Sequence, residues 1–256
     1  MKVFLISLIF ISSIVQSKIY QQNKIGFKKN LKISNKYLSK KMIEIELINL
    51  FNQKDIYKHS KHIKRKVLSY GAFSVPTLLK VMKEKKYSDK AKWIATFLLG
   101  RTAGTKSIGV LTKFTKHPNW VLRLASLRTL FSLNAKNLQV TSSKMLKDKS
   151  LLIRNQALDI ITTYGFKKES MNVWSMLYDK RNYNKKSTSS LVRKIIRSIG
   201  SLKFKKALKP LLKMSQKDKY NSLFAEIDYS LSNITGKNSP KGNIKLKKKF
   251  WNSLKI

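Results

Sequence analysis

The chain has 256 residues, of which 55 are Lys or Arg, 12 are Asp or Glu and none is Cys. The lack of cysteine excludes disulfide bonds and a lipidation thiol, so helix packing must stabilise the fold. The formal net charge of +43 favours an acidic or salt-tolerant partner, although Lys, Asn and Ile are all abundant and a biased genome composition accounts for a share of the charge.

The N-terminal segment, residues 1–17 with the sequence MKVFLISLIFISSIVQS, follows the pattern of a secretory signal peptide. Lys2 provides a basic start, an apolar run follows, and the segment ends on Ser17, a small residue at the expected cleavage point. The apolar run is shorter than the about 20 residues of a transmembrane helix, and an uncleaved anchor is the alternative. We expect a secreted or periplasmic protein, with a basic lead-in over residues 18–35.

Helical patterns begin at residue 36. Lys36–Phe51 carries a broad apolar face, and His59–Gly71 places Ile63 and Val67 on one side of a helix. We interpret these two segments as a divergent first helical pair, because terminal repeats have one face in water. Phe73–Glu84 is the next predicted helix, with a proline near its start, where the missing N–H costs nothing.

The centre of the chain repeats one helical motif. Within Asp148–Gly165, an apolar stripe of Ile153, Ala157 and Ile161 ends on Gly165, a residue suited to a left-handed helix cap. Arg154 stands beside this stripe and serves as an anchor for alignment. The equivalent positions along the chain are Lys92, Arg123, Arg154, Arg193 and Phe224.

The steps between these anchors show the period of the repeat. The step from Lys92 to Arg123 equals the step from Arg123 to Arg154, and it recurs from Arg193 to Phe224. Only the step from Arg154 to Arg193 differs, because it contains eight additional residues. One period with a single interruption is typical of a repeat array.

A second, more variable helix is predicted between successive anchored helices. Polar turns precede the anchored helices, and Asp89, Asn119 and Ser150 in these turns are good N-cap residues. No window alternates polar and apolar residues as a half-buried strand does, so the chain is predicted to be all-α. The variable helices are predicted at Ile108–Phe114, Leu138–Leu146, Met171–Tyr178 and Ala207–Met214.

This motif resembles HEAT repeats, especially the short HEAT-like repeats first associated with phycobilisome lyases. It consists of a polar turn, an aliphatic residue followed by Arg, and a small residue three positions later, as at Leu122-Arg123, Ile153-Arg154 and Val192-Arg193. The resemblance covers roughly residues 73–235. It implies an α-solenoid of about five to six antiparallel helix pairs over residues 36–235, and it says little about function.

The eight additional residues lie within Asp179–Ser190 and predict a loop on one edge of the array. A tolerated loop without function is the favoured interpretation, because long surface loops cost little stability. The functional alternative is a binding loop that uses Lys180, Arg181, Tyr183, Lys185 and Lys186.

The basic tail, residues 236–256, contains a predicted short helix at Ile244–Leu254. Leu246, Phe250 and Leu254 fall on one side of this helix. The tail either covers the last repeat or forms a detachable arm.

The anchors Lys92, Arg123, Arg154 and Arg193 form a basic row in sequence. They either bind turn carbonyls and acids such as Asp148, which holds the repeats together, or they face a phosphate- or sulfate-bearing ligand. The structural role is favoured, because a repeated polar position beside a buried stripe usually serves stacking.

Common catalytic signatures are missing from the sequence. His59 and His62 share a helix face without a third ligand, and Glu226 and Asp228 are expected to point apart. Most of the four tryptophans are expected to pack in the core or at interfaces. We therefore expect no enzyme activity, no cofactor and no metal.

The predicted function is that of a non-catalytic scaffold that binds a protein or peptide, with an acidic partner favoured, on the concave surface of the solenoid. The alternative is binding of a polyanion, namely nucleic acid, acidic polysaccharide or an anionic membrane surface, through the basic surface. Steep salt dependence shared by different polyanions is typical of the second function.

Overall fold

The computed structural model describes residues 40–183 and 190–254, and within these ranges the regular elements are all helical, which confirms the all-α prediction there. The chain divides into two compact units, Met1–Ala103 and Gly104–Ile256. The predicted signal peptide, residues 1–17, and the lead-in, residues 18–35, lie outside the described residues. Within the described ranges, no helix combines the length and hydropathy needed to cross a membrane.

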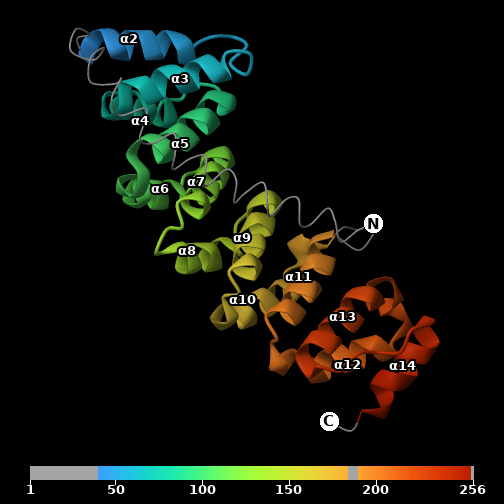
Figure 1. Cartoon of the computed structure of the whole chain (residues 1–256). Helices are drawn as coiled ribbons and strands as arrows, with labels where there is room; N and C mark the ends of the chain where they lie inside the picture. Colours follow the sequence, from blue (N-terminus) through green and yellow to red (C-terminus); the bar gives the residue numbers. More distant parts are fainter. Residues whose placement is uncertain (1–39, 184–189, 255–256) are drawn as a thin grey trace. The chain divides into compact units, whose positions relative to one another are not determined.

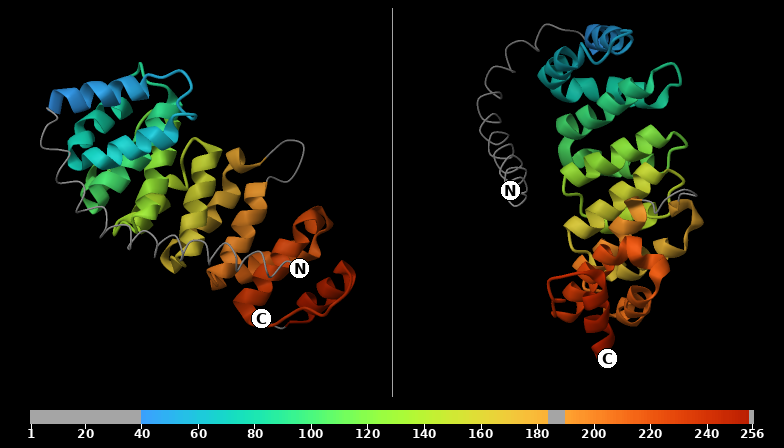
Figure 2. Two further views of the ribbon diagram at one scale, coloured as in Figure 1. Left: turned by 45° about the horizontal axis from the view of Figure 1, so that its top comes forward. Right: turned by 90° about the vertical axis from the view of Figure 1, so that its right-hand side faces the viewer.

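Over its described residues, 40–103, the first unit contains four α-helices and a short turn. Helix α2 packs against α3 and α4, and α5 packs against both α3 and α4 (Figure 2). Their buried stripes follow the predicted helical spacing, as Ile63 and Val67 of α3 show. The elements are α2 (Lys40–Phe51), α3 (Ser60–Tyr70), the 3-10 turn η1 (Gly71–Ser74), α4 (Val75–Lys83) and α5 (Asp89–Ala103).

The second unit places its helices in two layers followed by a terminal helix. Helices α7, α9, α11 and α13 pack each against the next, while α6, α8, α10 and α12 each pack against the helix that follows in sequence (Figure 1). The bounds agree closely with the predicted helices. The α-helices are α6 (Ile108–Phe114), α7 (Trp120–Ser132), α8 (Leu138–Met145), α9 (Leu151–Thr163), α10 (Ser170–Ser175), α11 (Ser190–Ser201), α12 (Leu208–Gln216), α13 (Phe224–Thr235) and α14 (Ile244–Ser253).

The predicted stripe of α9 is buried and its predicted end is correct. Ile153, Ala157 and Ile161 are inaccessible to solvent. Gly165 has a φ of 61°. The Phe166 N–H donates to the Ile161 carbonyl at 3.0 Å, and the Gly165 N–H donates to the Thr162 carbonyl at 3.1 Å. This pair of bonds is the Schellman arrangement, which satisfies the last carbonyls of a helix.

Helix α3 and the anchored helices α5, α7, α9, α11 and α13 are each followed closely by one residue with positive φ. Glycine adopts this conformation at no steric cost, whereas other residues are strained there. After α7 and α11 this residue is not glycine but Asn134 and Lys203, and the sequence analysis did not predict positive φ at either. The six residues are Gly71 (52°), Gly104 (54°), Asn134 (49°), Gly165 (61°), Lys203 (53°) and Gly236 (73°). One such end per helical pair is a structural counterpart of the sequence repeat.

Two of the three predicted N-cap positions are confirmed. Asn119 is the N-cap of α7, and its Oδ1 accepts from the Val121 N–H at 2.7 Å. Ser150 is the N-cap of α9, although its side chain makes no capping bond; its N–H donates to Asp148 Oδ1 at 2.8 Å. Asp89 is instead the first residue of α5, and Ser88 precedes it, with an Oγ that accepts from the Ala91 N–H at 3.2 Å.

Helix α14 covers the last helical pair and packs against α12 (Figure 1). Trp251 is only 1 % exposed and its Nε1 donates to Asp228 Oδ1 at 2.7 Å. Lys247 Nζ donates to Asp228 Oδ2 at 2.7 Å. The predicted apolar side is correct only in part, since Leu246 is exposed, Phe250 and Leu254 are half-buried, and the fully buried residue is Trp251. Of the two predicted roles for the tail, the described residues show the covering one.

One carboxylate of the second unit is buried among neutral donors. Glu169, in the 3-10 turn η3 (Lys167–Glu169), is 9 % exposed. It accepts hydrogen bonds from Gln139 Nε2 at 3.0 Å, from Asn172 Nδ2 at 2.8 Å and from Ser143 Oγ. Burial raises the pKa of Glu169, but these three hydrogen bonds outweigh burial and the net shift is downward from 4.5.

We expect Glu169→Gln to lower the stability of the chain at neutral pH by about 1–2 kcal/mol, because hydrogen bonds to a charged group are worth more than those to a neutral one. A lowered folded-state pKa gives stability that is present above the ordinary pKa and is lost as pH falls through the folded value. The difference between the two proteins in urea midpoint should therefore shrink below about pH 4.5. A difference that stays constant between neutral pH and pH about 3 contradicts this assignment.

Candidate binding edge of the second unit

The predicted anchors of the second unit are engaged in the fold rather than presented to solvent. Arg123 donates from Nε and Nη2 to the two carboxylate oxygens of Asp148, each at 2.8 Å. Its Nη1 donates to the carbonyls of His117 at 2.9 Å and Pro118 at 2.8 Å. Burial raises the pKa of Asp148, but the bonds from Arg123 and the Ser150 N–H outweigh it and the net shift is downward.

Arg154 is 1 % exposed and is held by four acceptors. Its Nη1 donates to the carbonyls of Asp148 at 2.8 Å and Lys149 at 3.0 Å, in the turn before its own helix. Its Nε donates to Asn182 Oδ1 at 2.7 Å and its Nη2 to the Arg181 carbonyl at 3.1 Å, in the turn before the next anchored helix. The guanidinium therefore joins two successive repeats.

The two remaining basic anchors are Arg193 and Lys92. Arg193 Nη1 donates to the Ser222 carbonyl and to Glu226 Oε2, the latter at 3.1 Å. Lys92 lies on α5 in the first unit, where its side chain is buried. Arg123, Arg154 and Arg193 thus each reach into the following turn, which is the contact expected of a residue that holds repeats together.

The candidate binding loop is ordered over its described part. Residues 180–182 form the 3-10 turn η5 (Lys180–Asn182), in which Asn182 is buried and donates to the Met176 carbonyl. Arg181 is neutralised by Asp179, with Nη2 and Oδ2 2.6 Å apart. Tyr183 Oη donates to the Leu177 carbonyl at 2.6 Å. Lys185 and Lys186 lie outside the described residues. Within residues 180–183 of this loop, Lys180 is exposed and forms no ion pair with a described residue, whereas Arg181 does.

An Asp-Lys dipeptide recurs in three successive turns of the second unit, and the sequence analysis missed it. Each aspartate is neutralised by a cation from the fold: Asp148 by Arg123, Asp179 by Arg181 and Asp218 by Lys248. Each lysine is exposed, and none of the three forms an ion pair within the part of the chain that the structure describes. We call Lys149, Lys180 and Lys219 the lysine row.

These turns are neighbours along one edge of the unit, where the anchored helices begin. Arg123 joins the turn at residues 117–120 to the turn at 147–152 through Asp148. Arg181 Nη2 lies 3.4 Å from the Lys147 carbonyl and joins that turn to the next one, at residues 178–183. Partial burial raises the pKa of Tyr183, and the nearby Tyr220 phenol, in the turn at residues 217–222, raises this pKa further. We call this surface the turn edge; it comprises residues 117–120, 147–152, 178–183 and 217–222.

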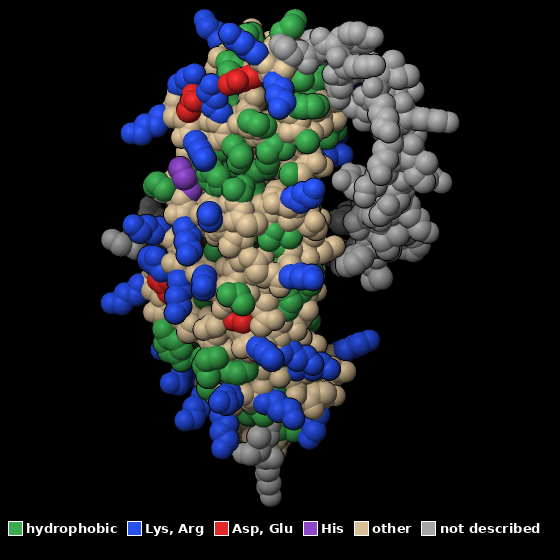
Figure 3. Space-filling view, turned by 90° about the vertical axis from the view of Figure 1, so that its left-hand side faces the viewer, with side chains coloured by type: hydrophobic (Ala, Val, Ile, Leu, Met, Phe, Trp, Pro, Cys, Tyr) green, Lys and Arg blue, Asp and Glu red, His purple; other side chains and the backbone are tan. Residues whose placement is uncertain are grey.

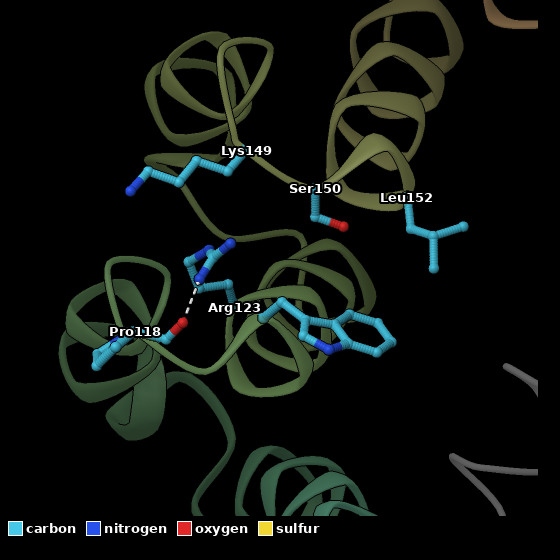
Figure 4. Close-up of a pocket in the computed structure, with 6 residues that line it drawn as sticks. Pro118, Arg123, Lys149, Ser150 and Leu152 are labelled. Carbon is cyan, nitrogen blue, oxygen red and sulfur yellow. Dashed lines mark hydrogen bonds between the residues drawn. The ribbon is translucent and has the colours of Figure 1, made fainter. Parts of the chain in front are cut away.

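A shallow pocket of about 410 Å³ opens on the turn edge between the beginnings of α7 and α9. In Figure 4, Lys149 and Leu152 extend to opposite sides of Arg123, which is hydrogen-bonded to Pro118. Trp120 is 45 % exposed and Leu152 is 54 % exposed. Trp120 therefore departs from the expected packing role, whereas Trp251 fulfils it. The pocket residues are Pro118, Trp120, Arg123, Lys149, Ser150 and Leu152.

Aromatic side chains also accompany the other two members of the lysine row. Tyr178 and Tyr183 flank Lys180 in sequence, and both are exposed. Lys219 Nζ lies 5.0 Å from the centroid of the Tyr220 ring, within the range of a cation–π contact. The turn edge therefore combines uncompensated ammonium groups with exposed apolar surface. Figure 3 shows Lys and Arg side chains spread over the face drawn, with few acidic side chains among them.

Groups that could carry catalysis are separated. Among the described residues, no three His, Cys, Asp or Glu side chains gather as metal ligands would. Glu226 pairs with Arg193, whereas Asp228 binds Lys247 and Trp251, so these two acids point to different partners as predicted. The turn edge offers charge and apolar contact, which are features of binding.

No protein-family model matches the chain, and no curated protein matches it significantly. The resemblance to HEAT repeats therefore rests on the sequence motif of this chain.

Proposed function

We propose that this chain is a non-catalytic, secreted or periplasmic HEAT-like α-solenoid that binds an acidic protein or peptide. Successive helical contacts and one left-handed end per pair support a solenoid of antiparallel helix pairs. Export would remove residues 1–17 after Ser17, which the N-terminal sequence of the exported protein checks. We place the binding site on the turn edge of the second unit rather than on the concave surface expected from the sequence.

The observation that carries this proposal is the pocket beside Lys149. Uncompensated ammonium groups at a surface contribute only about 1 kcal/mol per contact in water, so charge alone gives weak and unselective binding. Exposed Trp120 and Leu152 add apolar area, which is worth about 25 cal/mol per Å² when it is buried by a partner. Apolar side chains rimmed by polar ones mark interaction sites on soluble proteins.

Fluorescence anisotropy of the full chain tests this function. The labelled ligands are poly-glutamate, an acidic peptide that also contains Leu and Phe, single- and double-stranded DNA, and an acidic polysaccharide. We expect the mixed acidic and apolar peptide to retain most of its affinity as salt rises from about 50 to about 300 mM, because apolar contacts are not screened, while the polymers without apolar groups lose theirs.

Polyanion binding is the second candidate function, and the aromatic residues of the turn edge favour it. Bases of single-stranded nucleic acid stack on exposed aromatic side chains near cations, and the exposed Tyr178 lies two residues from Lys180. Tight binding of one polymer at physiological salt, with no binding of the mixed peptide, would put this function in first place.

A further inference from the structure

The lysine row keeps one register in successive repeats. The step from Asp148 to Asp179 equals the step between the anchors Arg123 and Arg154. The longer step from Asp179 to Asp218 equals the step from Arg154 to Arg193. The eight additional residues therefore fall after Lys180 and leave its place in the turn unchanged. Packed helices lie about 8–10 Å apart, so the three lysines are expected to recur at about that spacing along the turn edge.

A ligand matches this row when its charges recur at the same spacing on one side. A polyproline II chain has about 3 residues per turn and rises about 3.1 Å per residue, which puts every third side chain on one face at about 9 Å. A β-strand places third residues on opposite faces. Short isolated helices are marginal in water, and forming one costs ordering entropy, whereas polyproline II is a common conformer of unfolded chains.

We propose that the lysine row binds an extended, polyproline II-like acidic peptide with carboxylates at every third residue, and that one apolar side chain of this peptide fills the pocket beside Lys149. This inference rests on the proposed function and names its ligand class. Each carboxylate meets one ammonium group of the row. Trp120 and Leu152 contact the apolar side chain and fix the register of the peptide.

The exposed Asp218 favours this ligand over nucleic acid. Asp218 is paired with Lys248, yet its side chain is 90 % exposed, and it lies next to Lys219 in the turn. A nucleic acid carries a charge on every nucleotide, so a strand that follows the row brings a phosphate close to this carboxylate. A peptide with two neutral residues between its acids leaves the positions opposite the aspartates uncharged.

The experiment compares peptides of one length and one glutamate content, with acids at every second, third or fourth position and one Leu. They are titrated by anisotropy against the full chain and against Lys149→Gln/Lys180→Gln/Lys219→Gln. The matched control is Lys136→Gln/Lys167→Gln/Lys205→Gln, which removes equal charge from exposed lysines in the turns after the anchored helices. Trp120→Ala is measured with and without the Leu in the peptide.

We expect the peptide with every third residue acidic to bind most tightly, and the substitutions in the lysine row to weaken it about tenfold. The control substitutions should change its affinity less than about twofold. Trp120→Ala should weaken only the Leu-containing peptide.

Three results overturn the inference, and they can be told apart. Equal affinity for peptides of all three spacings contradicts binding along the lysine row, and so does an equal loss of affinity in the row and control variants. In both cases the proposed function stands. Binding of DNA without binding of any acidic peptide overturns the proposed function as well.

Discussion

Arg154→Ala should destabilise the second unit by about 2–4 kcal/mol, since it leaves the buried Asn182 side chain and three part-buried carbonyls without their donor. The guanidinium donates to the Asp148 and Lys149 carbonyls, in the turn between α8 and α9, and to the Asn182 side chain in the next turn. Water reaches these groups poorly, because Arg154 is 1 % exposed. Urea unfolding of the full chain, followed by circular dichroism, should show a lower midpoint.

Arg181→Ala is the matched control for Arg154. It removes an exposed guanidinium from the same turn and keeps the Arg181 carbonyl that Arg154 uses. An exposed ion pair contributes about 0–1 kcal/mol, so the midpoint should change little. Arg154→Lys should lie between the wild type and the alanine variant, because an ammonium group cannot span the same acceptors. Equal midpoints for the two alanine variants would show that Arg154 does not join the repeats.

Gly200→Ala should destabilise the second unit by about 1–3 kcal/mol, the usual cost of overpacking. A Cβ at this position of α11 would lie 2.5 Å from the Cα of Ser230 on α13. The neighbour is backbone and cannot turn aside, so the two helices would have to separate. Separation also weakens the buried hydrogen bond from Ser230 Oγ to the Ile196 carbonyl, which is 2.6 Å long. Thermal and urea unfolding of the full chain measure the loss.

Gly109→Ala is the control for Gly200 and has the opposite expected sign. A Cβ on Gly109 of α6 meets no atom within 4 Å. Gly109 lies in the first turn of α6, so the gain from alanine should be smaller than the about 0.5–1 kcal/mol of a helix interior, and this variant should be as stable as the wild type or slightly more stable. If both alanine variants were stabilising, the contact between α11 and α13 would not be as close as the structure has it.

The helices were predictable because their determinants are local. Ile153, Ala157 and Ile161 reveal the buried side of α9 through spacing alone, and Asn119 marks the beginning of α7. Asn134 and Lys203 were not recognised as left-handed helix ends, because residue type signals that conformation clearly only for glycine. The register of the repeat would have identified Asn134, which follows Arg123 at the same distance in sequence as Gly165 follows Arg154, whereas Lys203 lies one residue out of that register.

The turn edge, the candidate binding site, was not predictable from the features first singled out. The sequence predicts that a basic residue beside a buried stripe has a role. Two acceptors of Arg154, however, lie in the turn before the next anchored helix, and the sequence around Arg154 does not indicate which residues they are. The Asp-Lys dipeptides were visible in the sequence and share the period of the anchors. Their meaning depends on which carboxylate each cation neutralises, and that is a property of the tertiary structure.

Helix α14 also bears on assembly. It packs against α12, and its buried Trp251 binds Asp228 of α13. An uncovered end of a repeat array presents an apolar surface suited to stacking on another chain, and head-to-tail contacts whose rotation does not close grow into filaments. Because α14 covers such a surface on the last pair that the structure describes, we expect a chain without α14 to self-associate at lower concentration than the full chain.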